Sequence, residues 1–173
     1  MDVLIRNERK NDYVEIRKIN DLAFGQKNEG NMIEALRKTS DYNASLSLVA
    51  EIKNKIVGHI LFYPIKIKNE KKEYTVLSLA PLAVHPAYQN KGIGSKLVKR
   101  GLEIAKAIDF DAVIVVGHPN YYPRFGFIPA SNWELQLPFD APDDAFLALE
   151  LKESILKNGS GTVEYPKEYY EAM

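Results

Sequence analysis

The chain has 173 residues, of which 46% are apolar, and it contains no cysteine. Disulfide bonds, thiolate metal sites and a cysteine nucleophile are therefore excluded. Its 23 lysines and arginines balance 23 aspartates and glutamates, so no overall charge draws the protein to nucleic acid or to an anionic membrane. We find no apolar signal segment and no stretch near the ~18 apolar residues of a membrane span. These features predict a single cytoplasmic domain over residues 1–173.

The first part of the chain predicts one strand and two amphipathic helices. Residues 3–6 are apolar and typical of a strand. Asn11 and Asp12 can cap a helix that follows them. The apolar face of that helix comprises Tyr13, Ile16, Ile19, Leu22 and Ala23. Residues 25–30 interrupt the pattern, and a second helical face then begins at Met32.

From Ser45 onward the apolar spacing changes to that of strands. Residues 46–50 alternate between apolar and polar side chains, and residues 55–68 and 74–84 read as two long strands joined by a turn. Proline donates no hydrogen bond to a sheet ladder. Pro81 therefore predicts a bulge, or a point where its strand leaves a neighbour.

A helix is predicted over residues 93–108, and a strand buried on both faces over residues 112–116. A strand, a glycine-containing turn, a helix and a second strand make a βαβ unit, so strands 74–84 and 112–116 should be parallel neighbours. Residues 146–151 predict one more strand, and residues 158–161 predict a loop.

The turn before the predicted helix has the features of a phosphate site. Gly92 and Gly94 lack the Cβ atoms that would hold a phosphate away from the backbone. The N–H groups of the first helical turn and the helix dipole then favour an anion. A dinucleotide fingerprint fails because Leu97 stands at its third glycine, and a P-loop fails on residue order. A glycine-rich turn that merely starts a helix is the alternative.

Two segments carry a resemblance to a known family. Gln89-Asn90-Lys91-Gly92-Ile93-Gly94 resembles the Gln/Arg-x-x-Gly-x-Gly/Ala pyrophosphate motif of the GNAT (Gcn5-related) N-acetyltransferases. Residues 122–127, Tyr-Pro-Arg-Phe-Gly-Phe, match the Tyr-x-x-x-Gly-Phe sequence common in that family. Together with strand 79–84, they look like the YhbS-like branch, and the resemblance covers residues 3–151. It implies an α/β (α+β) GNAT fold, in which a central mixed twisted sheet with splayed parallel strands is flanked by helices.

The resemblance also implies an acyl-CoA-dependent N-acyltransferase that moves an acetyl group from acetyl-CoA directly to an amine. The acceptor would be a small molecule or a protein amino group. Backbone groups of Leu82, Ala83 and Val84 would contact the pantetheine, with Asn120 beside it. The cofactor pyrophosphate would meet Gln89, Asn90, Lys91, Gly92, Ile93, Gly94 and Ser95. Tyr122 would be the general acid, since a phenol with a pKa near ~10 is protonated at neutral pH.

The general base stays open among His118, Glu29, Glu34 and a chain of water molecules. Two other functions remain as alternatives: a non-catalytic acyl-CoA-binding sensor or regulatory module, and a partner-binding domain without cofactor. We expect no metal, nucleic-acid or membrane partner. Homodimers are frequent in the family, so a homodimer is an open alternative to a monomer.

Overall fold

The computed structural model describes all 173 residues and divides the chain into two compact units. The first unit contains Met1–Tyr63, Ala80–Ile104 and Lys167–Met173. The second contains Pro64–Leu79 and Ala105–Pro166. The long strands β3 (Lys55–Lys68) and β4 (Glu73–Val84) each contribute residues to both units. No helix is long and apolar enough to cross a membrane.

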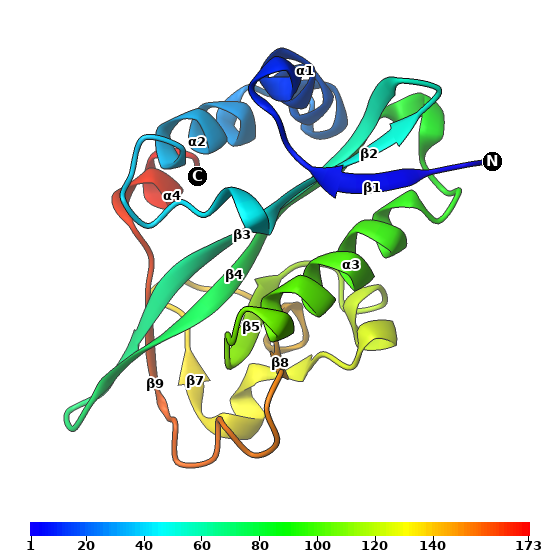
Figure 1. Cartoon of the computed structure of the whole chain (residues 1–173). Helices are drawn as coiled ribbons and strands as arrows, with labels where there is room; N and C mark the ends of the chain where they lie inside the picture. Colours follow the sequence, from blue (N-terminus) through cyan, green and yellow to red (C-terminus); the bar gives the residue numbers. More distant parts are fainter. The chain divides into compact units, whose positions relative to one another are not determined.

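The first unit is a small sheet with helices on it (Figure 1). Its further elements are β1 (Leu4–Asn7), η1 (Lys10–Asp12), α1 (Tyr13–Phe24), α2 (Asn28–Leu36), η2 (Ala44–Leu46), β2 (Ser47–Ile52), η3 (Pro86–Tyr88), most of α3 (Ile93–Ala107) and α4 (Lys167–Glu171). Strand β2 pairs antiparallel with both β1 and β3. Figure 1 shows α1, α2 and α4 gathered together, although α4 comes from the other end of the chain.

In the first unit, helices lie on both faces of β3. Successive side chains of a strand point to opposite faces, so neighbouring residues of β3 contact different helices. On one face, a Cβ added to Gly58 would lie 3.0 Å from Leu97 of α3. On the other face, His59 lies 3.4 Å from Asn20 of α1. Helices α1 and α3 thus contact opposite faces of the same strand, as expected for a sheet flanked by helices.

The start of α1 differs from the expectation that Asn11 or Asp12 caps it. Asp12 occupies the N-cap position but makes no side-chain cap bond to the helix. Its carboxylate instead accepts hydrogen bonds from Arg6 Nη1 at 2.7 Å and from the Arg9 backbone N–H at 2.7 Å. An ion pair with β1 thus replaces the predicted cap. The helix ends at Gly25, which takes the left-handed conformation with φ +67°.

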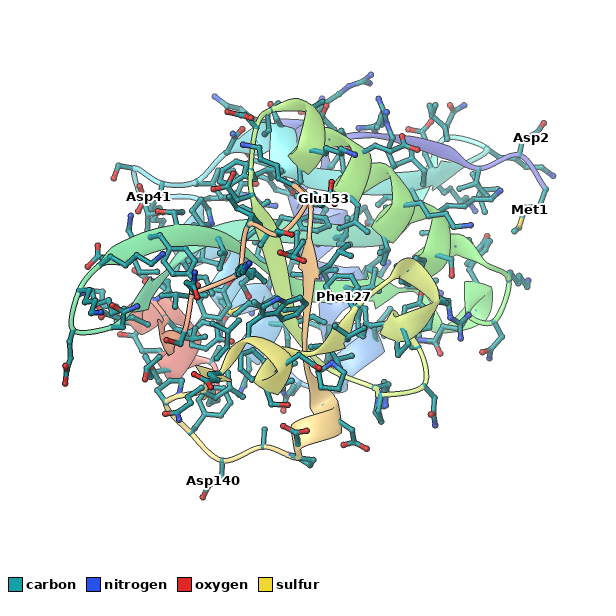
Figure 2. The ribbon with its side chains drawn as sticks, turned by 90° about the horizontal axis from the view of Figure 1, so that it is seen from below. Met1, Asp2, Asp41, Phe127, Asp140 and Glu153 are labelled. Atoms are coloured by element: carbon teal, nitrogen blue, oxygen red, sulfur yellow. The ribbon has the colours of Figure 1, made fainter.

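The second unit is built around β5 (Ala112–Val116), whose first four residues are buried. Its other elements are η4 (Tyr122–Phe125), β6 (Ile128–Pro129), η5 (Ala130–Trp133), β7 (Leu135–Gln136), η6 (Asp143–Ala145), β8 (Phe146–Glu150) and β9 (Gly161–Glu164). β5 pairs antiparallel with β8, which also pairs with β6. β9 pairs with the end of β3 and with β7. Figure 2 shows Phe127 among packed side chains, whereas Asp140 lies on an outer loop.

Strands β4 and β5 are parallel neighbours, as the βαβ pattern predicted. Their register has two pairs, Leu77 with Val113 and Ser78 with Ile114. Both strands continue beyond these residues, but the ladder does not. The Ala80–Pro81 peptide bond that follows is cis. The end of the ladder before Pro81 agrees with the expectation that this strand leaves its neighbour there.

Most predicted elements are confirmed with shifts of one or two residues at their ends. The interruption predicted over residues 25–30 is shorter, since α2 already begins at Asn28 and contains Gly30. The predicted loop at residues 158–161 ends in a strand, because Gly161 begins β9.

A buried polar network joins the helices and strands of the first unit. The guanidinium of Arg37 lies 2.8 Å from the carboxylate of Glu8, which also accepts a hydrogen bond from the Tyr42 hydroxyl. Burial works to raise the pKa of Glu8, but the bonds from Arg37 and Tyr42 outweigh it and lower the pKa. Glu8 is therefore a carboxylate in the folded protein, as a paired buried acid should be.

His59 continues this network as a neutral side chain. It is fully buried, its Nε2 lies 3.0 Å from Ser47 Oγ, and Asn20 Nδ2 lies 3.4 Å from its Nδ1. If Asn20 donates to Nδ1, then Nε2 carries the hydrogen and donates to Ser47. Burial lowers the pKa of His59 from 6.5 to about 4.

This burial predicts a stability loss in mild acid. Between the folded pKa of about 4 and the unfolded value of 6.5, the unfolded state binds more protons at His59, so stability falls as pH falls through that window. From about pH 7.5 to about pH 5, we expect wild type to lose about 2 kcal/mol more than His59→Gln, at about 1.36 kcal/mol per pKa unit. Urea unfolding at the two pH values measures the difference.

His118→Gln, which replaces an exposed histidine, is the matched control and should keep the wild-type pH dependence. A His59→Gln variant with the same acid loss as wild type would contradict the prediction.

Candidate functional site

The predicted phosphate turn lies between β4 and α3 in the first unit and is well ordered by its own hydrogen bonds. His85 N–H donates to Val57 O at 2.8 Å, which fixes the end of β4 to β3. His85 Nδ1 accepts from the Ala87 N–H, and the Gln89 amide donates to Val84 O at 3.0 Å. The chain therefore turns sharply from the strand and enters α3 in a set direction.

Gly92 is exposed at the point where the helix begins. It has φ +80°, and a Cβ built on it would meet nothing within 4 Å. The left-handed φ explains why glycine stands here. The open space shows that a ligand can reach the backbone. The N–H groups of Ile93 and Gly94 belong to the first helical turn, which has no partner for them within the helix.

The charges around this turn suit an anion. The first turn of α3 contains no acidic residue, so nothing opposes the positive end of the helix dipole. Lys91 is folded back on the turn, with Nζ 3.4 Å from Ala87 O and 5.4 Å from the Tyr88 ring. Lys96 is exposed on the next turn of the helix. An anion at Gly92 would thus meet backbone donors, and two lysines flank the turn in the sequence.

The strand that leads to the turn offers backbone groups in the first unit. Ala83 is buried, whereas its neighbours Leu82 and Val84 are half-buried, as expected for alternating side chains. Val84 O is already bonded to Gln89. Gln89 and Asn90 are exposed, and Asn90 also takes a left-handed conformation with φ +61°.

Tyr122, the predicted acid, lies in the second unit at the start of η4, where two aromatic rings hold its own. The Tyr121 ring stands at 85° to it with centroids 5.1 Å apart, and the Phe127 ring stands at 69° with centroids 5.7 Å apart. Tyr121 is itself covered by the Arg124 guanidinium, 4.5 Å from its centroid. Burial, followed by the charge of Tyr121, raises the pKa of the Tyr122 phenol. Tyr122 is therefore a hydroxyl donor throughout the neutral range.

Gly117 forms a third wall for this ring. A Cβ on Gly117 would lie 2.6 Å from Tyr122 Cε2, closer than real contacts allow. Its backbone is held in place, since its N–H donates to Ala145 O at 2.9 Å. The sequence argument gave Gly117 no role. The available signal was a glycine directly after a buried strand and close before Tyr122.

The other predicted residues of the second unit are exposed loop positions. The backbone oxygen of His118 accepts from the Tyr121 N–H at 3.1 Å, so the loop folds back on itself and leaves the imidazole at the surface. Asn120 is also exposed, and its backbone oxygen accepts from Arg124 at 3.4 Å. Both side chains are available to a ligand.

The acidic base candidates lie in the first unit, on α2. Glu29 is half-buried in the first helical turn, and its carboxylate accepts a hydrogen bond from Gln26 Nε2 at 3.1 Å. Glu34 is 51% exposed and pairs with Arg17 at 2.9 Å. Because the Glu34 carboxylate is occupied by Arg17 and Glu29 has no ion pair, Glu29 is the better candidate of the two.

Comparisons with known proteins identify the family of this chain. The acetyltransferase (GNAT) family model matches residues 13–127. The chain is 37% identical over 136 residues to the uncharacterized N-acetyltransferase YjhQ of Escherichia coli K12, covering 78% of this chain and 75% of YjhQ.

Two solved structures are similar over nearly the whole chain. The GNAT family N-acetyltransferase YhbS from Escherichia coli, in complex with CoA, has a TM-score of 0.89 and 28% identity, over 97% of this chain and 92% of that one. A GNAT family acetyltransferase from Brucella melitensis, in complex with acetyl-CoA, has a TM-score of 0.78 and 31% identity, over 97% and 98%. The similarity to YhbS confirms the predicted branch, and the chain belongs to the acetyltransferase (GNAT) family.

Proposed function

We propose that this protein transfers an acetyl group from acetyl-CoA directly to an amine, with the cofactor pyrophosphate bound at the start of α3. The observation that carries the proposal is Gly92, whose left-handed backbone stands in open space before two N–H groups of the first helical turn, which have no partner within the helix. Membership of the GNAT family supports it. So do the two similar proteins crystallised with CoA and acetyl-CoA.

The chain's own residues fit acetyl-CoA. Backbone donors of Gly92, Ile93, Gly94 and Ser95 would hold the pyrophosphate, with Gln89, Asn90 and Lys91 around it. Leu82, Ala83 and Val84 would contact the pantetheine through their backbone, and Asn120 through its amide. When bound, acetyl-CoA supplies an activated acyl group in its thioester. A backbone N–H near Val84 would stabilise the charge that develops on the acyl oxygen.

Tyr122 would act on the departing sulfur. Since its pKa is raised, the phenol is protonated, but it gives up its proton less readily than an ordinary tyrosine. A thiol of pKa about 8.5 is more acidic than such a phenol. We therefore expect Tyr122 to stabilise the thiolate chiefly by donating a hydrogen bond, with solvent completing the protonation.

The amine must lose a proton before it attacks. His118 and Glu29 are the candidates for this step, His118 as an exposed imidazole and Glu29 as the carboxylate without an ion pair. A chain of water molecules is the third candidate. Substitution can remove a protein base but not a chain of water molecules. Replacing the residue that acts as base should therefore change the pH profile of kcat, whereas replacing a residue that does not should leave the profile unchanged.

The remaining predictions concern the protein as a whole. We propose that residues 1–173 act as one domain, since the family match spans segments of both compact units. We also propose a cytoplasmic enzyme whose acceptor is a small molecule or a protein amino group, without a nucleic-acid or membrane partner. A homodimer remains an alternative state to test.

The proposed activity is tested by incubating the purified protein with acetyl-CoA and a panel of amines, including polyamines, amino acids and peptides with free amino groups. Thiol release and mass spectrometry of the amines measure transfer. Enzymatic acetylation of any class of amine supports the proposal. Acetyl-CoA binding without transfer to any of them would favour the sensor alternative.

The first variant is Gly92→Glu, which places a strained residue and a negative charge at the pyrophosphate position. We expect at least about a hundredfold loss of acetyl-CoA affinity, roughly 2.7 kcal/mol, measured by calorimetric titration. Gly25→Glu is the matched control, because Gly25 also has a positive φ, +67°, and open space around its Cβ position. Equal losses in both variants, or none in Gly92→Glu, would contradict the assignment.

The second variant is Tyr122→Phe, which removes the hydroxyl and keeps the ring packing. We expect kcat to fall about tenfold to a hundredfold with little change in the affinity for acetyl-CoA, since the hydroxyl is assigned to the transition state alone. Steady-state kinetics and calorimetric titration measure the two effects. An unchanged kcat would remove Tyr122 from the reaction.

The third variant, Gly117→Ala, pushes a methyl group against the Tyr122 ring. We expect kcat to fall about as far as in Tyr122→Phe while acetyl-CoA affinity is kept, and the double variant should be no slower than Tyr122→Phe alone. Gly159→Ala is the control and should keep the wild-type kcat, because its Cβ would crowd another tyrosine, Tyr74, at 2.8 Å from the hydroxyl and outside the proposed acetyl-CoA site. A double variant much slower than Tyr122→Phe would show that Gly117 acts by another route.

A further inference from the structure

The second unit contains a cavity of about 890 Å³ that shares no residue with the proposed acetyl-CoA site. Three segments line it: the turn between β3 and β4 at residues 69–72, residues 132–134, and the loop before β9. Its volume lies within the roughly 300–1,000 Å³ typical of small-molecule sites. We propose that this cavity binds a nucleotide, with the base on Trp133 and the phosphates on Lys71 and Lys72.

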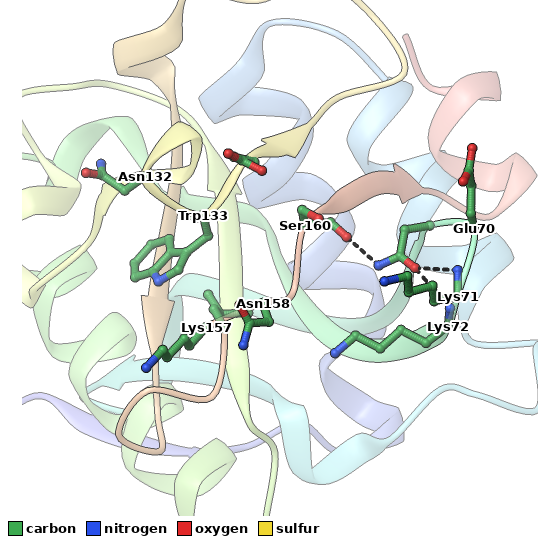
Figure 3. A pocket seen from close by; sticks show the side chains of 11 residues that line it. Glu70, Lys71, Lys72, Asn132, Trp133, Lys157, Asn158 and Ser160 are labelled. Atoms are coloured by element: carbon green, nitrogen blue, oxygen red, sulfur yellow. Dashed lines mark hydrogen bonds between the residues drawn. The ribbon is translucent and has the colours of Figure 1, made fainter.

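Hydrogen bonds between its walls form the cavity in advance of any ligand. Asn69 Oδ1 accepts from the backbone N–H groups of Lys71 and Lys72 at 2.8 and 2.9 Å, and Asn69 Nδ2 donates to Ser160 O at 2.6 Å. One side chain thus shapes the turn and ties it to the opposite loop, as Figure 3 shows. A ligand would therefore meet walls that need little ordering, which favours binding.

Hydrogen bonds also hold the loop before β9, on the other side of the cavity. The Leu156 N–H donates to the Glu150 carboxylate at 2.9 Å, and the Gly159 N–H donates to Leu156 O at 2.9 Å. The Tyr74 hydroxyl donates to Gly159 O. Asn158, at the tip, takes the left-handed conformation with φ +61°, which asparagine tolerates better than most residues.

The lysines of the cavity have no carboxylate partner. Lys68 and Lys152 of the same unit each meet two carboxylates within 3.1 Å. Lys71, Lys72 and Lys157 are exposed and form no ion pair, although Lys72 Nζ lies 5.2 Å from the Tyr74 ring. The ammonium groups of Lys71 and Lys72, which come from the same turn, can neutralise charges of a phosphate chain.

Two carboxylates also line the cavity, those of Glu70 and Glu134. Figure 3 shows the Glu70 carboxylate turned away from Lys71 and Lys72. The balance is three ammonium groups against two carboxylates, so the cavity keeps an excess of positive charge and favours an anion over a cation.

Trp133 gives the cavity its aromatic surface and makes a nucleotide a better fit than a bare phosphate. It is half-buried and is the only tryptophan in the chain. In Figure 3, Trp133, Lys157 and Asn158 occupy one end of the cavity, and Lys71 and Lys72 come from the turn at the other end. A base stacked on the indole gains about 1–3 kcal/mol. Trp133 at one end thus matches the base of a nucleotide, and Lys71 and Lys72 at the other end match its phosphates.

The unique tryptophan also makes the proposal directly testable, since its emission reports on this cavity. The probe is ATP, titrated into wild type and into Gly92→Glu, which removes the proposed acetyl-CoA site. We expect a saturable change in Trp133 emission in both proteins, with a dissociation constant below about 1 mM. Adenosine alone and pyrophosphate alone should each bind at least about tenfold more weakly than ATP.

Variants that reverse the charge of a lysine test where ATP binds. Lys71→Glu and Lys72→Glu should each weaken ATP binding at least about tenfold, whereas Lys55→Glu, at an exposed lysine of the first unit, should leave it unchanged. No change in emission up to about 10 mM ATP would overturn the proposal. Binding that is insensitive to the reversals, or lost in Gly92→Glu, would also overturn it. Pyrophosphate binding as tight as ATP binding would show that the base does not stack.

Discussion

The close approach of helix α3 to strand β3 is the constraint on which the first unit depends. A Cβ on Gly101 would lie 2.1 Å from Phe62, and a Cβ on Gly58 would lie 3.0 Å from Leu97. A side chain at Gly101 would therefore force the Phe62 ring or the helix to move, and one at Gly58 would press on the Leu97 side chain. The helix axis is fixed by them, and its first turn is therefore fixed at Gly92. The proposed phosphate site follows from this packing.

In the second unit, close packing fixes the position of one side chain, that of Tyr122. Gly117, Tyr121 and Phe127 leave the Tyr122 ring one position, and burial keeps its phenol protonated. A hydroxyl held by packing loses little entropy when it meets a reacting atom, which is how a preorganised donor assists a reaction. The aromatic residues around Tyr122 thus serve its orientation.

Sequence periodicity predicted the elements that are long or strongly patterned, such as α3 and β3, because a run of spaced apolar residues needs little knowledge of its partner. Short elements were missed. Strand β9 has four residues, and its pairing with β3 and β7 depends on segments far away in the chain. The capping role expected of Asp12 was wrong, since the spacing of residues does not reveal that Arg6 of β1 reaches its carboxylate.

The candidate site likewise has a part that the sequence predicts and parts that it does not. The turn at Gly92 was predictable because its residues are consecutive and its glycines have a local backbone reason. The wall formed by Gly117 was not, because its contact with Tyr122 depends on how the loop folds back. The cavity around Trp133 was not predictable either. Three segments separated in the sequence build it, and no short motif records their meeting.

The central claim, that acetyl-CoA binds at the turn before α3, is tested most directly by amide NMR of the ¹⁵N-labelled protein during titration with acetyl-CoA. We predict saturable shifts centred on the amides of Gly92, Gly94 and Ser95, with smaller shifts at Leu82 and Val84. Saturation that leaves these five amides unmoved, or an absence of any saturable shift, would contradict the account.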